Sequence, residues 1–302
     1  MILIVLLYAM WAASIVASKM ILAYTKPWFL VGVRMTISGL LLLGYQYFRD
    51  HARFKYRRKD LWLYAQYTIL GFVLPYNLRF WALESVSASK AMFLFSLAPF
   101  FSVIYSYLIF KDKVSRTQWV GLLLGSTGLI PILMTTSSVE EATMKFGFIS
   151  LPELSLIFAV ASTSYSWMVV RHLITRRNYS PMMLNGICMF AAGVISFVFS
   201  LVLEGNLPVS QALPFIGYLT FIIVISNIIC HNLYGYLLHK YTTNFLSFAG
   251  FLSPIFGCLY EWILFNETIT WHYYVSGIVI FSGLYLFYQD ELKQEQLIES
   301  EY

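Results

Sequence analysis

Two stretches of the chain decide its fold: residues 97–115 are LAPFFSVIYSYLIFKDKVS, and residues 252–270 are LSPIFGCLYEWILFNETIT. Each has a proline two residues after a leucine, continues as an apolar run, and ends with an acidic residue followed by a hydroxyl residue. The two stretches are 155 residues apart, and the same offset aligns YNL at 76–78 with HNL at 231–233. Several matches at one offset predict that the chain contains an internal repeat.

Composition places the chain among membrane proteins. Hydrophobic residues make up 59% of the 302 and charged residues 12%, with a mean hydropathy of +0.69. A soluble domain carries about 25% charged residues, so this chain has too few to wet a globular surface. The apolar residues come in blocks of about 20, the length a helix needs to cross the hydrocarbon layer. We therefore predict an all-α membrane protein, since lipid excludes unpaired backbone groups and the alternation typical of a β-barrel is missing.

Ten apolar runs separated by polar breaks predict ten transmembrane helices. Ser115 and Ser150 each precede a Gln or Glu at the third helical position, which is the capping-box pattern, and Ser180-Pro181 is a typical helix start. The first run lacks a basic segment before it and is too long for a signal peptide, so we interpret it as the first span. The predicted spans are 2–23, 27–48, 61–83, 90–110, 116–135, 150–172, 181–203, 212–238, 244–265 and 271–289.

Lysine and arginine gather in and beside alternate loops. Fourteen of them lie on the side of the membrane that holds the loops after the second, fourth, sixth and eighth runs and the C-terminal tail. Lys26, Lys90 and Lys145 lie on the other side. Cytoplasmic loops carry the excess of Lys and Arg, so this bias predicts that both termini are cytoplasmic. The net charge of +5 is therefore a topology signal and not a nucleic-acid footprint. We expect an integral, multi-pass protein of the inner or plasma membrane.

The repeat and the helix count together predict an inverted architecture. Residues 1–135 and 150–289 each hold five runs, with an inter-repeat loop at 136–149 and a cytoplasmic tail at 290–302. Because five is odd, the second half must cross the membrane in the direction opposite to the first. Two inverted five-helix repeats are typical of secondary transporters, which hold substrate near the midplane between the halves.

The fourth and fifth runs of each half also resemble a known family. Each fourth run has a mid-span proline and ends in a bulky apolar pair before an acidic residue, Asp112 or Glu267. Further matching residues in the first two runs are Trp11, Lys19, Pro27 and Arg34. In these features the chain resembles the EamA-type branch of the drug/metabolite transporter superfamily. The resemblance implies a five-plus-five inverted bundle that moves amino acids or other small metabolites by alternating access.

Ionisable side chains inside apolar runs are costly and mark functional sites by default. Arg34 lies about 10 Å into its helix at 1.5 Å per residue, so we predict that it binds substrate or pairs with an acid. Glu261 follows Pro254 by about two turns, and its repeat partner is Ser106. This asymmetry favours binding of substrate or a proton, and a structural partnership with an arginine is the alternative. Lys19 is a substrate-binding candidate too, unless it snorkels to the headgroups.

Two prolines and two asparagines occupy matching positions in the halves. Pro99 and Pro254 each remove a helix hydrogen bond, which predicts either a kink that changes with the transport state or a static bend. Asn77 and Asn232 carry amides that either bind substrate or join helices.

Aromatic residues make up 18% of the chain, and most are expected in the interfacial belts. Five lie away from the helix ends or on helices that the related family uses for its cavity, and we predict that they bind substrate: Tyr8, Trp11, Phe95, Trp167 and Phe248. An aromatic cavity suits an aromatic, purine or sulfonium ligand through stacking and cation–π contacts. Helix packing is the alternative for each of them.

Small residues and cysteines are interpreted structurally. Gly121, Gly125 and Gly128 form a small face that packs against another helix or against a second copy, so the chain is predicted to be a monomer or a homodimer. The three cysteines lie inside apolar runs without metal-ligand spacing, and we interpret them as packing residues.

These patterns predict a secondary carrier that moves a small amphipathic metabolite by exchange or by proton coupling. The candidates are an amino acid or a zwitterionic nucleoside conjugate such as S-adenosylmethionine, which some members of the related family carry. No phosphate-binding loop, metal cluster or nucleophile–base pair is present in the sequence, so we expect no cofactor, no metal and no enzymatic activity. A channel or sensory protein without alternating access, and less readily a membrane-embedded enzyme, remain the other classes.

Overall fold

The computed structural model describes residues 2–49, 57–110, 115–128, 130–134, 144–146, 149–205, 209–241, 243–265 and 270–300. Most of these residues lie in helices, and the sheet within them is a hairpin of β1 (Lys145–Phe146) and β2 (Ile149–Ser150). Six of the described helices are long and apolar enough to cross a membrane. The prediction of an all-α membrane protein is confirmed.

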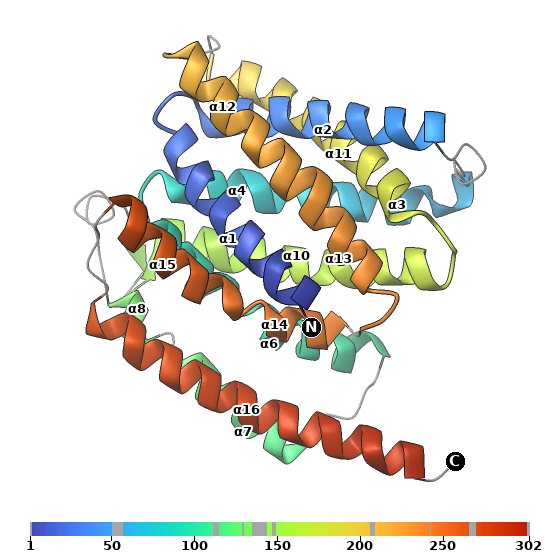
Figure 1. Cartoon of the computed structure of the whole chain (residues 1–302), viewed down its shortest axis with the longest axis vertical. Coiled ribbons are helices and arrows are strands. Elements are labelled where there is room, and N and C mark those ends of the chain that lie inside the picture. The colour runs from blue at the N-terminus through green and yellow to red at the C-terminus, as the bar shows by residue number, and fades with distance from the viewer. Residues whose placement is uncertain are drawn as a thin grey trace.

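The first half runs from α1 to α8 (Figure 1). Its third predicted span is a continuous helical run with a π-helical segment in the middle, and its fourth is interrupted by a turn. Its elements are α1 (Ile2–Ile21), α2 (Pro27–Arg49), η2 (Arg58–Asp60), α3 (Leu61–Tyr67), the π-helical η3 (Thr68–Val73), α4 (Leu74–Leu83), α5 (Ala88–Phe95), α6 (Ala98–Tyr105), η4 (Ser106–Phe110), α7 (Arg116–Thr127) and α8 (Ile130–Leu133).

The second half repeats these features. A π-helical segment lies in its third long helix, and a turn separates α14 from α15. Its elements are α10 (Leu151–Thr175), α11 (Pro181–Leu203), α12 (Ala212–Ile222), the π-helical η5 (Ile223–Cys230), α13 (His231–Leu237), α14 (Thr243–Ala249), α15 (Leu252–Phe265) and α16 (Trp271–Ser300). The chain enters α1 and leaves α16 at the right-hand ends of these helices in Figure 1.

Local sequence signals set several of the helix starts. Ser115 and Ser150 form complete capping boxes with Gln118 and Glu153, as predicted. Pro181 begins α11 as expected, but the Ser180 hydroxyl donates to Gln46 Oε1 at 2.9 Å instead of capping the helix. At the end of the chain α16 continues to Ser300, so the helix extends through most of the residues predicted to be a tail.

The predicted proline kinks are breaks between separate helices. Pro99 is the second residue of α6, and Pro254 is the third residue of α15. Backbone N–H groups in a first helical turn have no intrahelical partner, so neither proline removes a helix hydrogen bond. The expectation that each proline removes a helix hydrogen bond is therefore wrong. The chain turns just before each proline because Ser96–Leu97 and Gly250–Phe251 leave the helical path.

The contact between α2 and α11 is reciprocal. Gly39 lies against the backbone of Phe190, and Gly193 lies against the backbone of Thr36. Gly39 and Gly193 are 154 residues apart, and so are Thr36 and Phe190. Such an exchange of partners is what a two-fold relation between halves generates, as in a symmetric dimer interface.

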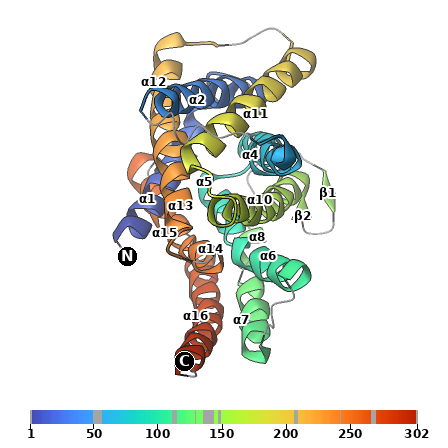
Figure 2. The same ribbon diagram turned by 90° about the vertical axis from the view of Figure 1, so that its right-hand side faces the viewer.

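The packing of α7 against α16 is reciprocal in the same way. Gly128 lies against Ile280, and Gly283 lies against Gly125, with an offset of 155 between equivalent residues. Both views show these two helices side by side at the edge of the bundle (Figures 1 and 2). The small face predicted on the fifth span therefore packs within the chain.

A substitution at Gly39 tests this close packing. We expect Gly39→Ala to destabilise the protein by about 1–3 kcal/mol, because the new methyl group must displace the backbone of α11. Gly44→Ala on the same helix is the matched control, since a Cβ at Gly44 has no atom within 4 Å. The midpoint of thermal unfolding in detergent is the measurement. Equal midpoints for the two variants would contradict the close approach.

Candidate functional site

A cavity of about 120 Å³ lies where helices of both halves meet. In the first half it is lined from α1, the α3–η3–α4 run, α5 and α6, and in the second half from α10, η5, α13, α14 and α15. The largest lining side chains are rings, namely Tyr8, Trp11, Tyr67, Tyr76, Phe95, Trp167, His231 and Tyr234. The π-helical segments η3 and η5 border it, and such segments are frequent at functional sites.

The rings form a cluster around Trp11 and Trp167. The ring centroids of Trp167 and Tyr234 are 4.0 Å apart, and Trp11 lies 5.5 Å from Tyr234 and 5.7 Å from Tyr8. The Tyr8 hydroxyl donates to the carbonyl of Leu246, which joins α1 to α14. Stacked and tilted rings of this kind can hold a planar base or face a cation.

Tyr76 and His231 join the two halves at the cavity wall. They are 155 residues apart, which makes them repeat equivalents, and Tyr76 Oη lies 2.9 Å from His231 Nε2. His231 Nδ1 lies 2.9 Å from the carbonyl oxygen of Ser226. Because a carbonyl only accepts, Nδ1 carries the proton of the neutral ring, and Tyr76 then donates to Nε2. Equivalent residues therefore meet across the boundary between the halves.

Two arginines approach the Tyr76 ring. The guanidinium carbon of Arg79, which lines the cavity, lies 4.3 Å from the ring centroid, and that of Arg34 lies 5.1 Å from it. Arg34 is fully buried and donates through Nη2 to Asn227 Oδ1 and, at 3.3 Å, to Ser226 Oγ. Arg34 does not line the cavity, but its bonds hold the η5 segment that does.

Glu261 and Lys19, both predicted to bind substrate, lie outside the cavity lining and stabilise helix ends. Glu261 accepts from the backbone N–H of Ala88 at 2.9 Å and of Ser89 at 3.1 Å, so it caps the N-terminus of α5. Lys19 donates to the carbonyls of Leu83 and Val86 at the C-terminal end of α4. Opposite charges at the two kinds of helix end match the helix dipole. The geometry supports neither as a substrate ligand.

A buried ion pair lies near the same end of the bundle. Lys90 Nζ is 2.7 Å from Glu153 Oε1, and both side chains are almost fully buried. Glu153 also completes the capping box of α10. At the opposite end Tyr179 donates to the buried Asp60 at 2.8 Å, and burial is the main cause that raises the pKa of Tyr179.

The predicted asparagines join helices. Asn77 donates to Ser196 Oγ at 2.9 Å, and Asn232 accepts from Asn185 at 3.0 Å, which ties the third and eighth predicted spans to α11. Neither lines the cavity. Pro99 lies beside the break in the fourth span and does not line the cavity either. The Phe248 side chain lies outside the described part of the structure, as do Asp112 and Glu267.

Four of the predicted substrate ligands do line the cavity: Tyr8, Trp11, Phe95 and Trp167. The sequence analysis did not predict five other residues that line the cavity: Tyr67, Tyr76, Arg79, His231 and Tyr234. Tyr76 and His231 stood in the aligned repeat motifs, and Arg79 and His231 are ionisable groups inside apolar runs, so a signal was present for three of the five.

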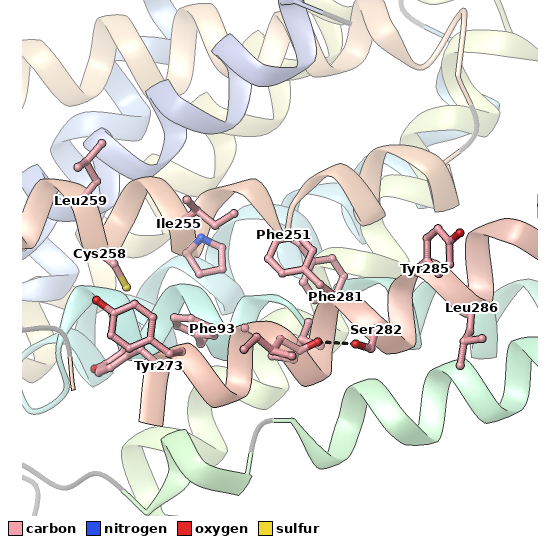
Figure 3. Close-up of a pocket in the computed structure, with 15 residues that line it drawn as sticks. Phe93, Phe251, Ile255, Cys258, Leu259, Tyr273, Phe281, Ser282, Tyr285 and Leu286 are labelled. Carbon is pink, nitrogen blue, oxygen red and sulfur yellow. Dashed lines mark hydrogen bonds between the residues drawn. The ribbon is translucent and has the colours of Figure 1, made fainter. Parts of the chain in front are cut away.

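A larger hollow of about 960 Å³ lies elsewhere, between α15 and α16. Figure 3 shows its side chains, Phe251 and Phe281 among them, along the strip between the two helices. Its Ser282 hydroxyl donates to Ile278 within its own helix. The lining is almost wholly apolar, and Ile278 is 68% exposed. This groove suits the lipid-facing exterior, whereas the smaller cavity combines rings, hydroxyls and a cation.

A helical membrane bundle with two matched halves around a polar and aromatic cavity defines a membrane transporter. The EamA-like transporter family matches residues 1–134 and 150–289. The chain belongs to the EamA-like transporter family, within the drug/metabolite transporter superfamily.

Relatives and a solved structure agree with this assignment. An S-adenosylmethionine/S-adenosylhomocysteine transporter of Chlamydia trachomatis serovar D is 30% identical over 96% of this chain and 89% of its own length. The protein of the same description from Chlamydia muridarum is 29% identical over 96% and 92%. The uncharacterized inner membrane transporter YedA of Escherichia coli K12 is 23% identical over 93% and 90%. A crystal structure of a protein 14% identical superposes with a TM-score of 0.66 over 94% of both chains, which shows a shared fold.

Proposed function

We propose that this protein is an alternating-access exchanger that carries S-adenosylmethionine against S-adenosylhomocysteine across the inner or plasma membrane. The observation that carries this proposal is the ring-lined cavity at the junction of the halves. Trp11, Trp167 and Tyr234 can stack on an adenine base and can face a sulfonium cation. The Chlamydia relatives carry this pair of compounds, which supports the same substrate class here.

Exchange is favoured over proton coupling through a carboxylate. Among the described residues that line the cavity there is no Asp or Glu. The nearby acids act elsewhere: Glu261 caps α5, and Glu153 pairs with Lys90. With no carboxylate in the lining to take up a proton, binding of a counter-substrate is the simpler event to drive the reverse transition.

The proposal includes ten spans in two inverted repeats with both termini in the cytoplasm. The reciprocal contacts of α2 with α11 and of α7 with α16 support a two-fold relation of the halves. The Lys and Arg bias of the loops supports the orientation. The cavity of about 120 Å³ is below the roughly 300–1,000 Å³ of ordinary ligand pockets. The halves must therefore move apart to admit a nucleoside conjugate.

Counterflow in liposomes tests the proposal. Vesicles with purified protein and internal S-adenosylhomocysteine are expected to take up labelled S-adenosylmethionine well above empty vesicles. Vesicles loaded with buffer alone should show little uptake, because an exchanger needs an internal partner. Uptake independent of the internal compound would indicate a channel, and uptake of labelled amino acids with none of S-adenosylmethionine would replace the substrate with the other predicted class.

A further inference from the structure

We infer that Arg79 binds the anionic group of the substrate, so that the cavity recognises a ligand with a carboxylate or phosphate beside an aromatic body. This inference rests on the proposed function for the identity of its first probe. Arg79 was not among the substrate ligands that the sequence predicted.

Arg79 has no charged partner among the described residues. Its guanidinium lies over the rings of Tyr76, Phe95 and Phe80 at 4.3, 5.4 and 5.6 Å from their centroids. Its Nε is buried without a hydrogen-bond partner. Cation–π contacts attract the guanidinium but do not neutralise its charge. A buried charge in a membrane protein normally pairs with an opposite charge or serves the substrate.

Arg34 adds a second positive charge close to that of Arg79. It is 0% exposed, its Nε and Nη1 have no hydrogen-bond partner, and its bonds through Nη2 are to neutral groups. Its guanidinium lies on the same Tyr76 ring as that of Arg79. Two like charges less than about 10 Å apart repel appreciably in a low-dielectric interior. The unliganded site therefore holds two positive charges that an anion would compensate.

Three acids in this part of the bundle are already engaged, and Glu84 at the end of α4 has Glu204, Lys26 and Lys19 as its charged neighbours. Glu261 is bound to the N-terminus of α5, and Glu153 to Lys90. Glu204 accepts from the backbone N–H of Trp28 at 2.8 Å and of Phe29 at 2.9 Å, which caps α2. Each has a helix end or a lysine to stabilise, so none is available to Arg79. Among the described residues no acid therefore compensates Arg79, and we infer that the ligand supplies the anion.

The position of Arg79 orients the ligand. Arg79 lies over the rings of Phe95 and Tyr76 at one part of the lining, and the tilted rings of Trp167, Tyr234 and Trp11 form another part of it. A planar guanidinium binds a carboxylate through two parallel hydrogen bonds. A ligand that stacks its base on the indole pair can reach Arg79 with a carboxylate at the other end of a flexible chain.

A pair of probes that differ only in the carboxylate gives the test. Binding of S-adenosylmethionine and of decarboxylated S-adenosylmethionine is measured on the full chain in lipid nanodiscs. For Arg79→Gln we expect S-adenosylmethionine affinity to fall about 10- to 100-fold, the loss typical of a charge-assisted hydrogen bond, and decarboxylated probe affinity to stay within about twofold. Arg176→Gln, an exposed site far along the chain, is the matched control and should change neither affinity. Equal losses for both probes would overturn the inference.

Thermal stability without adenosyl compounds separates this inference from the proposed function. Arg79→Gln is expected to melt at a higher temperature than the wild type, because it removes one of the two like charges that lie on the Tyr76 ring. Sodium acetate or phosphate should stabilise the wild type more than sodium chloride of equal ionic strength, and should lose that advantage in Arg79→Gln. If the wild type binds neither adenosyl probe but shows these shifts, the substrate is wrong and the anion site stands. A lower melting temperature for Arg79→Gln with no anion effect would refute the site.

Discussion

Replacing Lys90 by methionine is expected to destabilise the protein by about 3–5 kcal/mol, because it leaves the Glu153 carboxylate buried without its counter-charge. The pair joins α5 of the first half to the start of α10 in the second half. Both side chains are at most 3% exposed, so water cannot replace the lost partner. We expect a lower midpoint of thermal unfolding in detergent and less protein in the membrane.

The double variant Lys90→Met/Glu153→Gln tests the reason for this loss. Glutamine still completes a capping box at the third helical position, so the double variant removes both charges and keeps the cap. It is expected to recover much of the stability lost by Lys90→Met alone. If the double variant is as unstable as the single one, the unpaired carboxylate is not the cause.

Trp167→Ala is expected to weaken substrate binding strongly. Its ring is 8% exposed and lies 4.0 Å from Tyr234 and 6.3 Å from Trp11 at the centre of the aromatic cluster. Loss of one stacking ring costs about 1–3 kcal/mol for a bound base, or roughly 10- to 100-fold in affinity. Binding of S-adenosylmethionine to the purified protein measures this loss.

Two further variants distinguish a binding role from a packing role. Trp167→Phe keeps a smaller ring and should retain part of the affinity. Trp62→Ala, at a tryptophan that is 72% exposed, should bind as the wild type does. Unchanged affinity for Trp167→Ala in a protein that melts normally would move the binding site away from this cavity.

The polar contacts of the bundle divide into two groups with different consequences. Glu261, Lys19 and Glu204 each satisfy backbone groups at a helix end, and helix ends near the membrane surface need such partners. Among the described residues, Arg79 stabilises no helix end. Mutations in the first group should therefore lower stability, whereas a mutation of Arg79 should alter ligand preference.

The hydropathy pattern was a reliable guide to the helices because each helix satisfies its own backbone. All ten predicted spans begin within two residues of the start of a described helix, and the capping boxes at Ser115 and Ser150 formed as expected. The breaks before Pro99 and Pro254 were missed, because a proline in the first turn of a new helix and a proline that kinks one helix look the same in sequence.

The ligand set was harder to predict than the helices. Glu261 was predicted to bind substrate because it is an acid inside an apolar run whose repeat partner is Ser106. In the structure its carboxylate instead caps α5, a helix 173 residues away in sequence. Tyr76 and His231 were visible as repeat equivalents, but their contact depends on where the two halves meet. Sequence spacing does not specify such a meeting point.

The sequence by itself determined the membrane class, the apolar spans, the helix starts and the offset that relates the halves. These depend on residue type and on neighbours within about a helical turn. Only the tertiary structure decided which buried charges are compensated, which amides join helices and which rings surround a cavity. Pairing of a charge requires a partner a few ångströms away in space, and here those partners lie on distant helices. Arg79 was one of several intramembrane charges in the sequence, and in the fold it lines the cavity with no acid beside it among the described residues.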